Sequence, residues 1–167
     1  FAGQCRLIEK GYRQGGPAGY GLRRMLIDEH GNDKGTLKRG EHKSLQTDRV
    51  ILVPGPDEEI ETVRWIYRCF VDKRMNETEI ADQLNSQGIT TDLEREWTRS
   101  TVHQILINEK YIGHNVFNRT SCKLKKRRVH NDPDMWVRAE GAFEAIVETR
   151  YFYTAQGIIA ERSRKLS

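Results

Sequence analysis

The sequence has few cysteines and no long apolar segment. Its three cysteines, Cys5, Cys69 and Cys122, stand far apart and form no C-x-x-C pair. This spacing argues against a zinc site and a disulfide framework, and favours reduced thiols in an intracellular protein. No apolar run approaches the roughly 18 residues of a membrane span. The first residues also lack the cationic and apolar regions of a signal peptide. We therefore expect a protein that does not enter a membrane.

Recognisable catalytic motifs are also missing. The glycine-rich segment GGPAGYG is not followed by Lys-Ser or Lys-Thr, no G-x-G-x-x-G occurs, and no nucleophile or cofactor site stands out. His130, Asp132 and Asp134 could bind the metal of a nuclease, but Asn-Asp and Asp-Pro are also turn formers. Since no second acidic cluster pairs with these residues, a turn is favoured over a metal site. Incubation of supercoiled DNA with magnesium or manganese would separate the two.

The length and composition indicate one globular domain. The chain has 167 residues, of which 37% are hydrophobic and 31% charged, which is typical of a domain with much polar surface. Six of the fourteen glycines lie before residue 22, and four of them flank Pro17 within residues 15–21. We therefore expect an extended lead-in over residues 1–18 and the domain over 19–167. The first residue is Phe1 rather than Met, which suggests a piece of a longer protein.

The net charge of +4 conceals an uneven distribution. Residues 56–96 carry five basic and eleven acidic side chains, a balance of −6, whereas residues 97–131 carry eight basic and one acidic, a balance of +7. Five of the six residues from Lys123 to Arg128, here called the basic cluster, are basic. Such a pattern is typical of a face that binds a polyanion. A solvated lysine-rich loop is the alternative.

Apolar periodicity predicts an α+β fold that is mainly helical. Apolar residues recur every three or four positions over 57–73, 77–87, 99–108 and 149–162, as in amphipathic helices. Asn76 followed by Glu79 predicts a capping box, Gly88 a left-handed helix end, and Thr98 or Ser100 the cap of the third helix. The second and third helices resemble a helix-turn-helix unit.

Strand-forming residues flank the helices. The runs 20–27 and 44–53 predict a small N-terminal β-hairpin with a long polar loop. The runs 111–119 and 135–141 predict a second, longer hairpin after the third helix, called the wing, whose tip carries the basic cluster. A wing of this kind can follow a phosphate backbone while the neighbouring helix enters the major groove.

This arrangement nominates residues for DNA binding. If Val102, Ile105 and Leu106 face inward, the helix turns Ser100 and Gln104 outward. Glutamine can pair with adenine, arginine with guanine, and serine with either. Each of these could equally be an ordinary solvent-facing residue. The candidate set comprises Arg13, Arg23, Arg24, Arg99, Ser100, Thr101, His103, Gln104, Arg119, Lys123, Lys125, Lys126, Arg127 and Arg128.

Several segments together resemble the recombinase domain of large serine recombinases, the phage integrases and transposon resolvases of that type. They are PAGYGLRR, DEEIETVRWIYRCFVD, NETEIADQLNSQGITT, EWTRSTVHQILINEKYIGHNVFN and AIVETRYF, and they come in the order seen in that family. The resemblance covers roughly residues 17–162. It is most specific in EIADQLNSQGI and in the segment from Trp97 to Gly113.

The resemblance implies a domain that binds one half of a recombination site on double-stranded DNA. TRSTVHQILIN would be the major-groove helix, and residues 13–19 would lie in or near a linker that tracks the minor groove. The family's catalytic serine domain and zinc ribbon are not in this chain, so by itself it should bind DNA without cutting it. The full-length protein would act as a dimer or tetramer on DNA. It would be encoded by a bacterium or a phage and associate with the nucleoid in the cytoplasm. A winged-helix transcription regulator, dimeric and bound to a palindrome, is the alternative.

Overall fold

The computed structural model describes residues 18–28, 30, 33–37, 49–117, 120–123, 127–130, 137–139 and 143–166. In chain order the elements are β1 (Leu22–Ile27), β2 (Asp33–Leu37), β3 (Arg49–Pro54), α2 (Asp57–Val71), α3 (Glu77–Ser86), α4 (Arg99–Ile107), η1 (Glu109–Ile112), β4 (Asn115–Phe117), β5 (Thr120–Lys123), β6 (Arg127–His130), β7 (Val137–Ala139) and α5 (Thr149–Leu166). The α+β class predicted from the sequence is confirmed. Within the described residues, no helix is both long and apolar enough to span a membrane.

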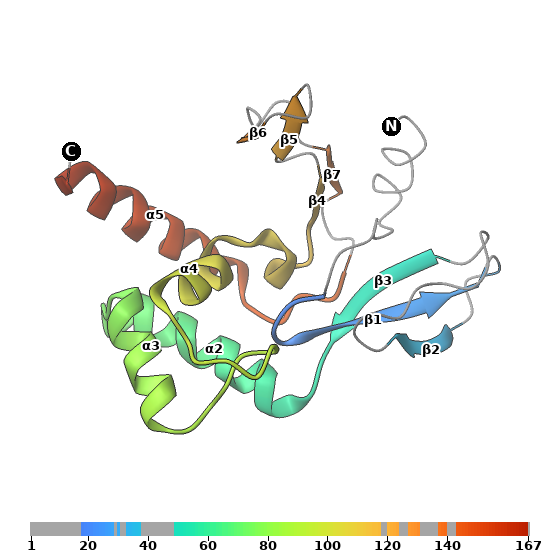
Figure 1. The fold of residues 1–167 in the computed structure, drawn as a ribbon, viewed down its shortest axis with the longest axis horizontal. Coiled ribbons are helices and arrows are strands. Elements are labelled where there is room, and N and C mark those ends of the chain that lie inside the picture. The colour runs from blue at the N-terminus through green and yellow to red at the C-terminus, as the bar shows by residue number, and fades with distance from the viewer. Residues whose placement is uncertain are drawn as a thin grey trace.

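The N-terminal strands form a three-stranded antiparallel sheet beside the helices (Figure 1). β1 pairs with β3 from Leu22 opposite Pro54 onward, as the predicted hairpin requires. β2 pairs with the other edge of β1 and was not predicted. Its sequence, DKGTL, contains residues that are depleted in strands, so its conformation depends on the free edge that β1 offers.

α2 forms the centre of the helical part. Its predicted apolar stripe, including Ile60, Val63 and Phe70, is buried. Pro56 is the N-cap, and three acidic residues occupy the first turn, where the helix dipole favours negative charge. The hydroxyl of Tyr67 donates a hydrogen bond of 2.7 Å to the carbonyl oxygen of Ile105, which ties α2 to α4.

The predicted start and end of α3 and the predicted start of α4 are confirmed. Asn76 and Glu79 form a capping box at α3, and Thr98 is the N-cap of α4. Gly88 has a φ of +72°, in the left-handed region that ends a helix. The side chain of Asn85 makes two hydrogen bonds of 2.8 and 2.9 Å to the backbone of Trp97. These bonds hold the long connection between the two helices against α3.

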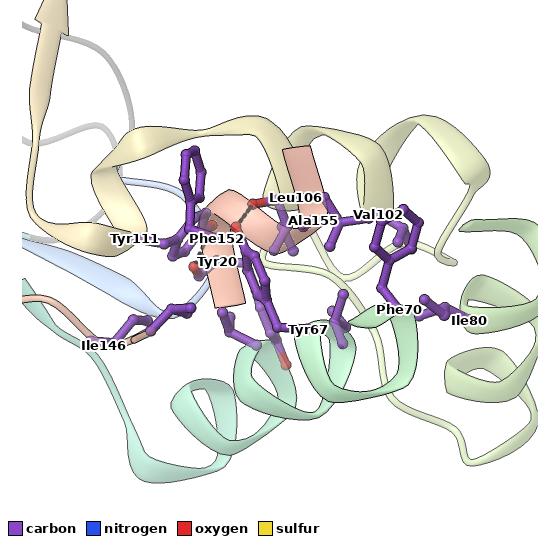
Figure 2. Close-up of a cluster of buried hydrophobic side chains, with 14 of the residues drawn as sticks. Tyr20, Tyr67, Phe70, Ile80, Val102, Leu106, Tyr111, Ile146, Phe152 and Ala155 are labelled. Atoms are coloured by element: carbon purple, nitrogen blue, oxygen red, sulfur yellow. Dashed lines mark hydrogen bonds between the residues drawn. The ribbon is translucent and has the colours of Figure 1, made fainter. Parts of the chain in front are cut away.

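α5 packs across α2 and α4 and closes the core (Figure 2). Phe152, Ala155 and Ile158, spaced three positions apart, are buried on its inner side, as the apolar periodicity over residues 149–162 predicts. The side-chain amide of Gln156 donates a hydrogen bond of 2.6 Å to the carbonyl oxygen of Leu106. α4, the second helix of the predicted helix-turn-helix-like unit, is therefore hydrogen-bonded to both α2 and α5.

The wing leaves the helical part directly after η1 (Figure 1). β4 pairs with β7 at its base, and β5 pairs with β6 nearer its tip, both antiparallel. Gly113, with a φ of +90°, makes the turn from η1 into β4. The backbone N–H of Phe143 donates a hydrogen bond of 2.9 Å to the carbonyl oxygen of Gly113. The two ends of the hairpin thus meet at a fixed point beside η1.

Candidate nucleic-acid interface

α4 has one buried side and one exposed side. Val102, Ile105 and Leu106 are buried against the core, whereas Ser100 and Gln104 are exposed. Because Ser100 and Gln104 are one turn apart, they lie in one row along the helix. This row is free to meet a partner without any rearrangement of the core.

Thr101 forms part of the N-terminal cap of α4. Its hydroxyl oxygen accepts a hydrogen bond of 2.8 Å from the N–H of Thr98, and the hydroxyl of Thr98 accepts one of 3.3 Å from the N–H of Thr101. The Thr101 hydroxyl also donates to the Thr98 carbonyl oxygen at 2.9 Å. This capping box satisfies helix N–H groups that would otherwise lack partners, so the Thr101 hydroxyl is already engaged.

Arg99 and His103 form a second row on α4, next to α3. Both approach the same oxygen of Glu77, which is at 3.8 Å from Nη2 of Arg99 and at 3.3 Å from Nδ1 of His103. The Arg99 side chain remains 68% exposed. One carboxylate therefore lies at ion-pair distance from two of the predicted DNA-binding residues. Because Glu77 lies in a separate helix, sequence periodicity gave no indication of this contact.

Arg23 is engaged at the junction of the sheet and α2. Its guanidinium donates to both carboxylate oxygens of Glu59, at 2.5 and 3.0 Å, and the N–H of Gly21 donates to Glu59 at 2.9 Å. Arg23 and Glu59 thus clamp the start of β1 to the first turn of α2. Arg24, the next residue on β1, is half-buried and points to the other face of the sheet.

Burial and the clamp act on the pKa of Glu59 in opposite directions. Burial raises it, but the hydrogen bonds from Arg23 and Gly21 and the positive charge of Arg23 outweigh burial and hold the pKa below its usual value. A carboxylate with a lowered pKa stabilises the fold above the usual glutamate pKa of about 4.3. That contribution disappears as the pH falls through the lowered value.

Glu59→Gln is therefore expected to unfold at a lower temperature than the wild type at neutral pH. The difference in melting temperature should shrink as the pH falls below about 4. Thermal unfolding followed by circular dichroism across this range measures it. Glu58→Gln, at an exposed position in the same turn, is the control. If the difference in melting temperature between Glu59→Gln and the wild type stays constant at every pH, the ion pair between Arg23 and Glu59 does not stabilise the fold as proposed.

The wing is described by its backbone alone. In β5 and β6, Lys123 lies opposite Arg127, and Cys122 lies opposite Arg128. The strand pairing therefore brings part of the basic cluster together at one end of the hairpin. Of the remaining candidates, Arg13, Arg119, Lys125 and Lys126 lie outside the described residues.

The structure offers no assembled metal site among the residues it describes. No three His, Cys, Asp or Glu side chains within them lie close enough together to hold an ion. In the alternative nuclease site, Asp132 and Asp134 lie outside the described residues, and His130 is described by its backbone in β6.

Comparison with known proteins adds a family and a related fold. Residues 57–162, more than half of the 167-residue chain, match the sequence model of the family described as Recombinase. A solved structure described as "Crystal Structure of a LSR-DNA Complex" is similar over 95% of this chain, with 19% sequence identity and a TM-score of 0.52. This chain covers 38% of that protein. No curated protein matches the sequence significantly.

Proposed function

Because this chain belongs to the Recombinase family, as a recombinase domain of the large serine recombinase type, we propose that it binds recombination-site DNA and positions a catalytic domain there. The observation that carries the proposal is the geometry of α4. Its apolar side packs on α2, α3 and α5, and its polar side, with Ser100 and Gln104, is exposed. A helix presented in this way after a helix-turn connection is typical of a major-groove reader.

The wing and the charge distribution support the same proposal. The wing follows α4 after one short 3-10 helix, so the two elements are neighbours along the chain. Residues 97–131, which include both, carry the +7 balance. Contacts from lysine and arginine to phosphates would supply affinity, and contacts from α4 to base edges would supply specificity. No cofactor is needed for binding of this kind.

The wider role of the protein follows as part of the proposal. The related solved protein is described as bound to DNA, and this chain spans 38% of its length, so cutting and joining are assigned to a catalytic domain rather than to residues 19–167. We further propose that residues 1–18 link the two domains. The complete protein would act as a dimer or tetramer on DNA, in the cytoplasm of a bacterial cell.

The test starts from a library of random-sequence duplexes, from which the protein should select one sequence. A footprint over an asymmetric half-site is expected, whereas selection of a palindrome by a dimer would favour a winged-helix regulator. Failure to select any sequence would contradict site-specific binding. Supercoiled DNA should stay intact in the presence of magnesium, since nicking would favour the nuclease alternative.

Gln104→Ala is expected to relax the preference at one or two base pairs of the selected site. The loss should amount to about 1–3 kcal/mol of discrimination if Gln104 pairs with a base in bidentate fashion. Competition binding with single-base-pair variants of the selected duplex measures it. Gln83→Ala, at an exposed glutamine of α3, is the control. An equal loss on every sequence would instead make Gln104 a backbone contact.

A further inference from the structure

Glu77 is a buried carboxylate with no evident role in packing. Its residue exposure is 8%, and it is the one charged side chain within the described residues that is counted as buried. It occupies the first position of α3, where the helix dipole stabilises a negative charge. Burying an ionised carboxylate is costly unless it is paired. The charged and polar groups around Glu77 therefore offset the cost of burying its carboxylate.

Each oxygen of this carboxylate faces a different helix. Oε2 faces α4, where it lies near Arg99 and His103. Oε1 faces α5, at 3.7 Å from Nη1 of Arg162. Arg162 is itself fixed, since its guanidinium lies 4.8 Å from the centre of the Phe70 ring and donates to the carbonyl oxygen of Arg74 at 3.1 Å. Arg162 of α5 thus places a positive charge beside the side of the carboxylate away from α4, at ion-pair distance but without a hydrogen bond from Nη1.

The contact fixes how His103 can act toward a partner. An ionised carboxylate only accepts hydrogen bonds, so Nδ1 of His103 must donate to Glu77. In the neutral ring the other nitrogen, Nε2, is then an acceptor. Arg99, one turn earlier and 68% exposed, keeps further N–H donors at the surface. One buried group therefore sets the orientation of the Arg99 and His103 side chains on the same edge of α4.

We propose that Glu77 is a positioning residue that orients Arg99 and His103 for base-pair recognition. This inference rests on the proposed function and deepens it, because it assigns part of the sequence specificity to a residue that does not itself reach DNA. A guanidinium held on one side loses less conformational entropy when it binds a base edge. The Glu77 carboxylate is buried between the cationic side chains of Arg99 and Arg162, which also limits its repulsion of phosphates.

The test compares Glu77→Gln with Asp82→Asn. Both variants remove one negative charge from α3, but Asp82 is exposed and takes part in no ion pair that involves Arg99 or His103. The probes are the duplex that the wild-type protein selects from the random library and its single-base-pair variants. For Glu77→Gln, discrimination at the base pairs read by Arg99 or His103 should fall about tenfold. Asp82→Asn should leave discrimination unchanged at every position.

A combination with Arg99→Ala separates positioning from a general structural role. If Glu77 acts through Arg99, discrimination at the base pair read by Arg99 should be no worse in the double variant than in Arg99→Ala alone. Equal, additive losses would overturn the proposal. If Glu77→Gln fails to fold, Glu77→Asp retains the charge but draws the carboxylate back, and a loss of about threefold at the same base pair is expected. Unchanged discrimination in that variant would overturn the proposal too.

Two failures can be told apart. If the wild-type protein selects no sequence, the proposed function fails. If it selects a sequence and Glu77→Gln then behaves like Asp82→Asn at every base pair, only the positioning role fails.

Discussion

Replacing Lys125, Lys126, Arg127 and Arg128 together with alanine is expected to weaken DNA binding on the order of a hundredfold at low salt, for all sequences alike. Each phosphate contact releases condensed counterions, so log K falls against log salt with a slope of about −0.9 per contact. Loss of four contacts should therefore flatten the slope by about 3 to 4. Titration of a labelled duplex at several salt concentrations measures both quantities.

The control removes the same number of positive charges from exposed positions outside the wing. Its four alanine substitutions are at Arg68, Lys73, Arg150 and Lys165. This variant has the same net charge as the wing variant, so a general electrostatic effect would alter both slopes equally. If the slope of the wing variant equals that of the wild type, the wing makes no phosphate contacts and the charge-based part of the proposal is wrong.

Gly113→Ala is expected to destabilise the domain by about 2–5 kcal/mol. Gly113 has a φ of +90°, which disfavours any residue with a Cβ, and an added Cβ would lie 2.4 Å from the carbonyl oxygen of Phe143. Because that oxygen belongs to the backbone, the chain that returns from the wing must move away. Urea unfolding gives the change in free energy, and DNA titration shows whether affinity falls as the base of the wing shifts.

Gly88→Ala separates the penalty of a positive φ from the steric clash with the backbone. Gly88 also has a positive φ, of +72°, but nothing lies within 4 Å of the position of an added Cβ. It should cost only the conformational penalty of about 1–2 kcal/mol, and DNA affinity should not change. A cost for Gly113→Ala no greater than that for Gly88→Ala would mean that the return chain adapts freely, contrary to the fixed base of the wing.

Local patterns in the sequence were sufficient to predict most of the helical fold. The stripe of Ile60, Val63 and Phe70 predicted the buried side of α2, and the pair Asn76 and Glu79 predicted where α3 begins. These features could be recognised because helix periodicity and capping depend on residues within about four positions of one another. The resemblance in segments 76–91 and 97–113 likewise predicted the family that the match over residues 57–162 shows.

The exposed candidates on α4 were predicted for the same reason, since the buried positions of one helix determine which residues face outward. What those side chains contact was not predictable. β2 has a sequence unfavourable to a strand and forms because β1 has an edge to pair with. Arg23 was nominated for DNA binding, yet its guanidinium pairs with Glu59, which is 36 positions away.

The sequence by itself thus determined the helices, their buried faces and the concentration of positive charge between residues 97 and 131. Only the tertiary structure decided which charges neutralise one another inside the protein. Glu77 lies at ion-pair distance from Arg99 of α4 and from Arg162 of α5. Its carboxylate also contacts His103, which is 26 positions away. No local pattern encodes such a pairing, because the packing of α3, α4 and α5 brings these side chains together and burial makes the pairing necessary.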